Sequence, residues 1–588
     1  MKENFYSTYI KRCLDVVCAI ITMIVFCWLY AIIAILVRIK LGRPVIFSQY
    51  RPGKNEKIFK LYKFRSMTNA RDENGDLLPD SKRLTKFGRI LRTTSLDELP
   101  EVWNIFKGDM SVVGPRPWSM FDLKYYSDEE RKRFLVAPGL TGWAQVNGRN
   151  AADWSERLLF DTDYVAHTSF LLDVKIVFAT MGKMLKRSNV VVRGEGKVGE
   201  FAVVRMLEEQ TSTKENVNPS QEIGGFFEQE SEWSQTQDFT PTAWLPQGID
   251  SVYTFSGRDA IAMAIRDIQE SRNTSIKRAY LPSYCSVIMA EPFLENGIKI
   301  DFYEVEYNNS DLEYKIDFGK NCDVFFAMQY FGSRNEKVDE AIRAFHHRGI
   351  PVIEDITHCL LDATPHSPFS DYCIASLRKW FAIPTGGYLM KNSGALLVCP
   401  KQDGSAAVRE RIAIMERKRN YLRGEVENKT ELITINQRLD AALIYERGLT
   451  IDPVSAGILQ NLNIESVRAR RIRNGEILLK AVEGLTMIKP AFSREKQTGC
   501  CPLFFPIAVE NPRRNELKTY LERNGIYCMI HWPERMGTNC GLRDTELSLV
   551  CDQRYSEQNM YRVGECLRQF EEMQIVETES EFNIQKAF

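Results

Sequence analysis

Histidine is scarce in this sequence, with only six in 588 residues, and that scarcity argues against a histidine-rich metal site. No internal repeat is present. The 14 cysteines are scattered, and they show neither a pair of Cys-x-x-Cys motifs nor the spacing of metal ligands. We therefore expect reduced thiols in a cytosolic compartment rather than a disulfide framework.

Net charge is also absent, because 77 basic residues balance 77 acidic ones. The balance hides a split, since residues 1–200 carry 32 Lys and Arg against 22 Asp and Glu, and the remainder carries 45 against 55. A basic segment suits an anionic membrane surface or a phosphate-rich substrate, and an acidic remainder suits a soluble domain. Uneven surface charge without a function would give the same counts.

One long apolar run stands near the start of the chain. Val16 to Val37 are 22 uncharged, mostly apolar residues, enough to cross a bilayer as a helix. The run is too long for a signal peptide and no small-residue cleavage site follows it, which makes a cleaved signal peptide a poor interpretation. Basic residues stand on both sides, so the positive-inside rule does not choose an orientation. We expect one helix over about residues 13–38, either re-entrant or spanning.

The rest of the chain predicts two α/β domains joined by a linker. Residues 1–205 form the membrane-anchored domain, in which 171–187 is an amphipathic helix on the membrane surface or an ordinary packed one. Residues 206–245 are rich in Glu, Gln, Ser and Thr and predict a linker. Helical stretches alternate with short apolar runs over 246–588, which predicts a mostly parallel α/β domain.

Three segments rich in Gly, Pro and Arg accompany an acidic pair, Asp97 and Glu98. They read RTTSLDELP from Arg92, GDMSVVGPRP from Gly108 and PGLTGWAQVNGRN from Pro138. Rigid turns of this kind bring backbone N–H groups and guanidinium groups to phosphate. A carboxylate pair beside them can hold Mg²⁺ on a diphosphate or attack phosphorus. Taken alone, an Asp-Glu pair is more typical of a solvated helix face.

Together with KRCLDVV and KLYKFRSM, these segments closely resemble the bacterial sugar transferases, the monotopic phosphoglycosyl transferases, from about Lys11 to Arg187. The resemblance implies a small α+β domain on the cytoplasmic face of the bacterial inner membrane. It also implies a ping-pong reaction. Asp97 would attack the β-phosphate of a UDP-sugar and release UMP, and polyprenyl (undecaprenyl) phosphate would then take the phospho-sugar from the aspartate.

The resemblance also assigns roles to single residues. Asp97 would contact Mg²⁺ as well as act as nucleophile, and Glu98 would complete the dyad as a metal ligand or in proton handling. Three arginines would face the phosphates or the nucleotide: Arg92, Arg116 and Arg149.

The apolar run departs from that family at its midpoint. Family members often carry Ser-Pro there, where proline breaks the helix and turns it back. This chain has Cys27-Trp28, and residues 26–32 contain no proline or glycine. Both the re-entrant and the spanning helix therefore stay open.

A second set of motifs lies in the C-terminal part. Asp355 and His358 follow an apolar strand-like run, and ligands of parallel α/β sheets bind at the carboxyl ends of strands. Lys379 follows Ser376 by three residues and precedes a Thr-Gly-Gly turn. The segment FSGRDAIAMAI places a glycine turn at the start of a helix, where N–H groups can bind phosphate.

This pattern resembles the DegT/StrS-type sugar-nucleotide aminotransferases, which use pyridoxal phosphate, over roughly residues 223–569. The resemblance implies the aspartate aminotransferase (type I) fold. Lys379 would form the Schiff base, Asp355 would pair with the pyridine nitrogen, and His358 would lie near the ring or its phenolate. Further cofactor contacts would come from Ser256, Gly257, Arg258 and Ser376 at the phosphate and from Tyr284 stacked on the ring.

The lysine motif departs from this family as well. In the family the serine usually lies further from the lysine. A Glu-Gly-Gly turn usually stands where this chain has Thr385-Gly386-Gly387. We expect a bifunctional enzyme whose C-terminal domain converts a UDP-4-keto sugar to an amino sugar, with glutamate as donor and as a homodimer. The alternative is a C-terminal domain that binds sugar or a partner protein without catalysis. We expect no nucleic-acid partner.

Overall fold

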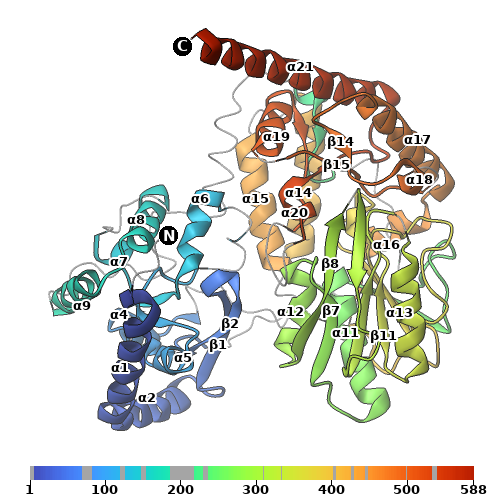
Figure 1. Ribbon diagram of the computed structural model, residues 1–588. Helices are drawn as coiled ribbons and strands as arrows, with labels where there is room; N and C mark the ends of the chain where they lie inside the picture. Colours follow the sequence, from blue (N-terminus) through green and yellow to red (C-terminus); the bar gives the residue numbers. More distant parts are fainter. Residues whose placement is uncertain are drawn as a thin grey trace. The chain divides into compact units, whose positions relative to one another are not determined.

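The chain forms two compact units, Met1–Glu209 and Gln210–Phe588, which are blue to teal and green to red in Figure 1. The computed structural model describes residues 5–68, 83–118, 123, 126–147, 154–185, 218–228, 236, 238–308, 310–332, 334–401, 406–425, 429–443, 448–497, 500–510, 512–532 and 540–587.

The apolar run of the first unit forms two helices instead of the single predicted one. After a short π-helix, η1 (Tyr6–Ile10), α1 (Lys11–Val25) and α2 (Cys27–Lys40) meet at an angle of 65°. Within the described residues no single helix has the length and hydropathy to cross a bilayer, whereas this bent pair has both. The expectation of one helix over residues 13–38 is thus corrected to a broken pair.

Packing explains the break, although no proline or glycine is present. Ala19 of α1 lies in a core with Val102 and Ile105, whereas Ile33 and Val37 of α2 lie in a separate core. Each helix therefore follows a different part of the unit. The carbonyl oxygen of residue 26 accepts hydrogen bonds from the N–H groups of residues 29 and 30, so the backbone of the break is satisfied by the first turn of α2.

The rest of the first unit is a small α+β arrangement. β1 pairs antiparallel with β2, and β3 pairs parallel with β4. Its remaining elements are β1 (Ile46–Pro52), η2 (Lys54–Glu56), β2 (Ile58–Phe64), α4 (Lys86–Thr93), η3 (Leu96–Glu98), α5 (Glu101–Lys107), β3 (Ser111–Val113), α6 (Asp128–Arg131), η5 (Lys132–Leu135), β4 (Gly139–Thr141), α7 (Trp143–Asn147), α8 (Trp154–Ala166) and α9 (Phe170–Leu185). The predicted amphipathic helix is α9, with Ile176 buried and Leu171 79% exposed.

Glycines allow the Gly/Pro/Arg segments to pack backbone against backbone. A Cβ atom at Gly139 would lie 2.0 Å from the Gly114 nitrogen, and one at Gly142 would lie 2.2 Å from the Gly114 oxygen. No side chain fits at these distances. The segments that carry Arg116 and the 138–142 turn therefore form one rigid support.

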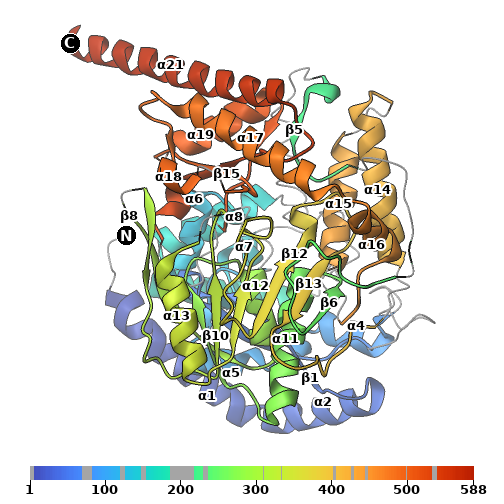
Figure 2. The ribbon, with the colours of Figure 1, turned by 90° about the vertical axis from the view of Figure 1, so that its right-hand side faces the viewer.

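An eight-stranded mixed sheet forms the centre of the second unit, in the order β6-β13-β12-β11-β10-β7-β8-β9 (Figures 1 and 2). The five strands from β12 to β8 run parallel, and β6, β9 and β13 pair antiparallel. The predicted, mostly parallel α/β arrangement is confirmed. The strands are β6 (Asp250–Thr254), β7 (Arg278–Pro282), β8 (Lys299–Asn308), β9 (Asp311–Lys315), β10 (Val324–Met328), β11 (Val352–Asp355), β12 (Tyr372–Ser376) and β13 (Gly387–Lys391).

Helices cover this sheet through two separate cores. One core joins it to α11 (Gly257–Arg272), α12 (Val287–Glu295) and α13 (Glu336–His347), and the other joins it to α16 (Pro453–Gln460) and α17 (Ile464–Val482). A smaller sheet has the order β14-β15-β17. The remaining elements are η6 (Pro219–Gln221), η7 (Leu377–Lys379), α14 (Ala406–Leu422), α15 (Lys429–Leu443), β14 (Lys489–Pro490), α18 (Arg494–Gln497), β15 (Phe505–Ala508), α19 (Arg513–Arg523), β16 (Ile526–Tyr527), α20 (Leu542–Thr545), β17 (Glu546–Leu549) and α21 (Glu557–Ala587).

Part of the predicted linker belongs to the second unit. β5 (Ile223–Gly224) pairs parallel with β16, and the Ile223 side chain is fully buried. Leu245 is buried as well. Polar composition concealed these contacts because single apolar residues provide them.

Gly88 allows α4 to lie directly against the end of β2. A Cβ atom at this position would stand 1.8 Å from the carbonyl oxygen of Ser66. The close approach also brings Arg92, one turn later on α4, to Ser66, whose Oγ lies 2.9 Å from Arg92 Nε. Gly182 of α9, by contrast, has no atom within 4 Å of an added Cβ.

We expect Gly88→Ala to lower the free energy of unfolding by about 1–3 kcal/mol, because the clash outweighs the higher helix propensity of alanine. Gly182→Ala should raise it by up to about 1 kcal/mol, because only the propensity changes. Thermal unfolding of the detergent-solubilised chain measures both. Equal shifts in the two variants would contradict the packing of α4 on β2.

Candidate active sites

The acidic pair of the first unit lies in a tight turn between two helices. Ser95 takes a left-handed conformation with φ of 54° and ends α4, and the short helix η3 follows with Asp97 and Glu98. Pro100 then starts α5. Asp97 is only 8% exposed, so the turn holds a carboxylate largely out of water.

Two cations hold Glu98. Lys63 Nζ lies 2.7 Å from Glu98 Oε1, and Arg116 Nη2 lies 3.0 Å from the same oxygen. Lys63 also reaches Glu101, with its Nζ 3.0 Å from Glu101 Oε1. Burial raises the pKa of Glu98, but the charges of Arg116 and Lys63 outweigh this and hold its pKa at about 2. Glu98 is therefore an anion fixed in place.

Asp97 differs from its neighbour in both respects. Burial and the charge of Glu98 raise the pKa of Asp97 to about 6, against the opposing charges of Lys63 and Arg92. In the part of the chain that the structure describes, no other side chain makes an ion pair or hydrogen bond with its carboxylate. A desolvated carboxylate without a side-chain partner is the more reactive nucleophile of the two.

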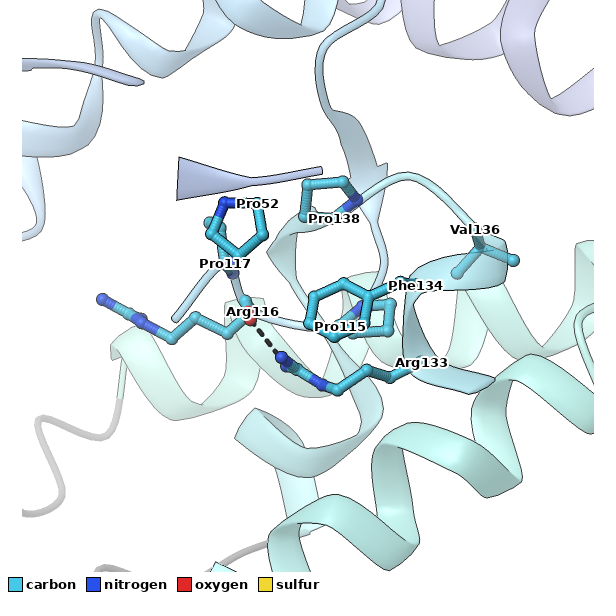
Figure 3. A pocket seen from close by; sticks show the side chains of 8 residues that line it. All are labelled: Pro52, Pro115, Arg116, Pro117, Arg133, Phe134, Val136 and Pro138. Carbon is cyan, nitrogen blue, oxygen red and sulfur yellow. Dashed lines mark hydrogen bonds between the residues drawn. The ribbon is translucent and has the colours of Figure 1, made fainter. Parts of the chain in front are cut away.

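Two of the three predicted arginines lie near the acidic pair. Arg116 contacts Glu98, and Arg92 is close enough for its charge to act on Asp97. Arg149 lies outside the described residues. Arg133 Nη2 donates to the Arg116 carbonyl oxygen at 2.7 Å (Figure 3). The same guanidinium forms a buried ion pair with Asp161. The hollow beside Arg116 is walled by prolines and is too small for a nucleotide.

Lys63 and Glu101 were not predicted as site residues. Lys63 stands inside KLYKFRSM, one of the segments that carried the resemblance, and Glu101 directly follows another, RTTSLDELP. Charge balance is the signal in the sequence that could have pointed to Lys63. Two adjacent buried carboxylates require a nearby cation, but only the fold shows which strand supplies it.

A Mg²⁺ ion would find one free protein ligand here. No group of three or more His, Cys, Asp or Glu side chains with metal-binding geometry occurs among the described residues. Mg²⁺ in phosphate-transfer sites commonly takes one or two carboxylates and completes its shell with phosphate oxygens and water. The unpaired Asp97 carboxylate fits that arrangement, in which the substrate brings the ion.

The residues predicted for the second site meet at one edge of the large sheet. Asp355 ends β11, and Ser376 ends the neighbouring parallel strand β12, from which η7 leads to Lys379. Thr357 connects them. Its N–H donates to Asp355 Oδ1 at 2.8 Å, its Oγ1 accepts from the Ser376 N–H at 3.0 Å, and its carbonyl oxygen accepts from Trp380 Nε1 at 2.7 Å.

Lys379 keeps an exposed side chain although the surrounding protein desolvates it. Burial lowers the pKa of Lys379, and the charge of Asp355 opposes that shift. Burial likewise raises the pKa of Asp355, against the hydrogen bonds from Thr357 and the charge of Lys379. An amine of lowered pKa that remains accessible suits covalent chemistry with a carbonyl group.

His358 presents an unused hydrogen-bond donor. Its Nδ1 accepts from the Phe331 N–H at 3.2 Å, so the neutral ring carries its proton on Nε2. The ring is fully buried, burial holds its pKa well below the usual range, and Nε2 has no partner among the described residues. The Tyr284 hydroxyl is buried and unpartnered as well. An acidic oxygen of a bound ring would satisfy such a donor.

The predicted phosphate end is partly engaged within the chain. A Cβ atom at Gly257 would lie 2.9 Å from Ser376 Cβ, so the start of α11 packs tightly on the end of β12. Ser256 caps α11, and its Oγ donates to Asp259 Oδ2 at 2.5 Å. Arg258 forms an ion pair with Glu291 at 2.8 Å. The ring end thus fits a pyridoxal group, whereas Ser256 and Arg258 already have partners.

A curated relative and a solved structure match this chain over different lengths. Undecaprenyl-phosphate galactose phosphotransferase of Salmonella typhimurium is 37% identical over 198 residues, and the match spans 31% of this chain and 41% of that protein. Among solved structures, a DegT DnrJ EryC1 StrS aminotransferase from Brucella abortus is 16% identical with a TM-score of 0.38, and the match covers 55% of this chain and 86% of that one.

The first unit carries a family match of its own. The bacterial sugar transferase family matches residues 6–187. EpsL, an uncharacterized sugar transferase of Bacillus subtilis (strain 168), is 48% identical over 176 residues, which make up 30% of this chain and 87% of EpsL. By this match and this identity, the chain belongs to the bacterial sugar transferases.

Proposed function

We propose that the first unit transfers a sugar phosphate from a UDP-sugar to polyprenyl phosphate, with Asp97 as nucleophile. The observation that carries this proposal is the contrast within the acidic pair. Glu98 is held by Lys63 and Arg116, whereas Asp97 is desolvated and has no side-chain partner among the residues that the structure describes. The name of the Salmonella relative, which specifies an undecaprenyl-phosphate acceptor, supports the choice of acceptor.

Two displacements at phosphorus complete the reaction. A carboxylate oxygen of Asp97 bonds to the β-phosphorus, the bond from that phosphorus to the bridging oxygen breaks, and UMP leaves with the electron pair. An oxygen of polyprenyl phosphate then bonds to the same phosphorus. The bond to Asp97 breaks, which restores the carboxylate and yields the lipid diphosphate sugar.

Cations make these steps possible, because two anionic substrates must approach an anionic nucleophile. Arg116 and Lys63 fix the charge of Glu98 beside the reacting carboxylate, and Arg92 adds a positive charge near Asp97. Mg²⁺ held by Asp97 and the diphosphate would neutralise further charge. The bent pair α1–α2 would keep this site at the cytoplasmic face of the bacterial inner membrane, where the lipid acceptor is found.

For the second unit we propose a pyridoxal-phosphate-dependent transamination that supplies the amino sugar, with glutamate as donor, in a homodimer. The unpartnered Nε2–H of His358 beside Lys379 and Asp355 is the observation that favours it. Pyridoxal phosphate supplies an electron sink when bound. Lys379 would hold it covalently, Asp355 would keep its ring nitrogen protonated, and His358 would donate to its phenolate. The alternative is a unit that binds sugar or a partner without catalysis.

Replacement of Asp97 by Asn should abolish UMP release from a UDP-sugar, with a loss of at least about three orders of magnitude, because the amide is not a nucleophile. UDP-galactose and N-acetylated UDP-hexosamines serve as the substrate panel, and released UMP is quantified by chromatography. Glu129→Gln, at a carboxylate that is 77% exposed in the same unit, is the control and should keep full activity. Undiminished release by Asp97→Asn would refute the nucleophile assignment.

Lys63→Met should lower UMP release by about tenfold or more, because Glu98 and Glu101 lose the ammonium that neutralises them. Lys60→Met is the matched control on the same strand, since Lys60 Nζ lies over the Tyr50 ring rather than beside a carboxylate. It should stay within about twofold of the parent chain. Equal losses in both variants would show that UMP release depends on positive charge along β2 in general rather than on the contact of Lys63 with Glu98 and Glu101.

The full chain purified with added pyridoxal phosphate should show a visible absorbance band, and Lys379→Ala should lose it. Thr357→Val should weaken cofactor binding by about tenfold, because the buried Ser376 N–H loses its acceptor. Thr357→Ser keeps the hydroxyl and should restore binding. Titration of the absorbance measures each constant. A parent chain without any band would reject this second function and favour the non-catalytic alternative.

A further inference from the structure

Two aromatic side chains stand exposed on the helix that follows the acidic turn. Trp103 is 48% exposed and Phe106 is 36% exposed, and their rings stack with centroids 5.4 Å apart at an interplanar angle of 24°. The opposite side of α5 is buried through Val102 and Ile105. Isolated exposed apolar residues are ordinary, but a stacked pair close to reactive groups presents a continuous apolar surface to a ligand.

Both ends of the segment from Leu99 to Phe106 are hydrogen-bonded to the bent helix pair, α1 and α2. The Tyr30 hydroxyl of α2 donates to the Leu99 carbonyl oxygen. At the other end Arg12 of α1 donates to the carbonyl oxygens of Ile105 and Phe106 at 2.6 and 2.7 Å. α5, which carries the stacked pair, is thus tied to the bent helix pair, which exposes many apolar residues, such as Ile24 at 68% and Ile39 at 70%.

We propose that Trp103 and Phe106 bind the isoprenoid chain of the lipid acceptor; this rests on the proposed transfer to polyprenyl phosphate. The acceptor has an anionic head and an apolar chain. The turn before α5 offers cations for the head, since Lys63 and Arg116 meet at Glu98. The aromatic pair begins five residues after Glu98 and offers flat apolar faces for the first isoprene units, whose burial removes both surfaces from water.

The two half-reactions separate this role from the chemistry. UMP release in a single turnover without acceptor needs only Asp97 and the UDP-sugar, so Trp103→Ala and Trp103→Ala/Phe106→Ala should stay within about twofold of the parent chain. With undecaprenyl phosphate in mixed micelles, KM as a mole fraction should rise about tenfold or more, while kcat at saturation changes little. Trp103→Phe should recover most of the affinity.

Trp28→Ala is the matched control, because Trp28 is 58% exposed on α2 but is not part of the stacked pair. It should leave KM for the acceptor unchanged. Binding to vesicles of anionic phospholipid is measured for all variants. If the α5 variants lose vesicle binding but keep KM, the pair is a bilayer anchor and the proposal fails. A parent chain that releases no UMP would instead reject the proposed function itself.

Discussion

The first site depends on one ammonium group placed among carboxylates. Asp97, Glu98 and Glu101 fall within five residues, of which Asp97 and Glu101 are buried and Glu98 is partly buried. Such a cluster is unstable when ionised, because burial and mutual repulsion both favour protonation. Lys63 offsets this repulsion because its ammonium group contacts both Glu98 and Glu101. Burial and the charge of Glu98 raise the pKa of Glu101 to about 7, against the opposing charge of Lys63. Asp97 makes no ion pair with a described residue.

That arrangement explains why much of the surrounding sequence is glycine, proline and arginine. Arg116 must reach Glu98 from a segment far along the chain, and it does so because its backbone is fixed by the buried ion pair of Arg133 and Asp161. The backbone contacts at Gly139 and Gly114 hold the same segment. The motifs therefore serve positioning as much as direct phosphate contact. Loss of one support would move the Arg116 guanidinium away from the acidic turn and leave Lys63 as the remaining cation at Glu98.

The sequence allowed the prediction of features that leave a local signature. The amphipathic α9 and the parallel strands of the second unit followed from residue spacing or apolar pattern, whereas the role of the acidic pair came from the resemblance and stays a prediction. The break at residue 26 did not follow from such a pattern, because it arises from two cores that pull α1 and α2 in different directions. Lys63 and Thr357 were not predicted either, because their contacts depend on the fold. Each contacts segments distant in the chain, and neither residue type marks a site by itself.

At the second site, the ring end and the phosphate end differ in how far they follow the local sequence pattern. Asp355, His358 and Lys379 come together as predicted, but the start of α11 satisfies itself through Ser256 and Asp259. Asp259 in the first turn of α11 accepts hydrogen bonds from Ser256 Oγ and from the Gly448 N–H, and its carboxylate lies at the positive end of the helix dipole. In the proposed function, a phosphate bound at this end would meet the charge of Asp259, so its affinity would come mainly from the ring end. The proposed function would then rely mainly on Lys379, Asp355 and His358, and it would separate covalent capture of the ring from recognition of the phosphate.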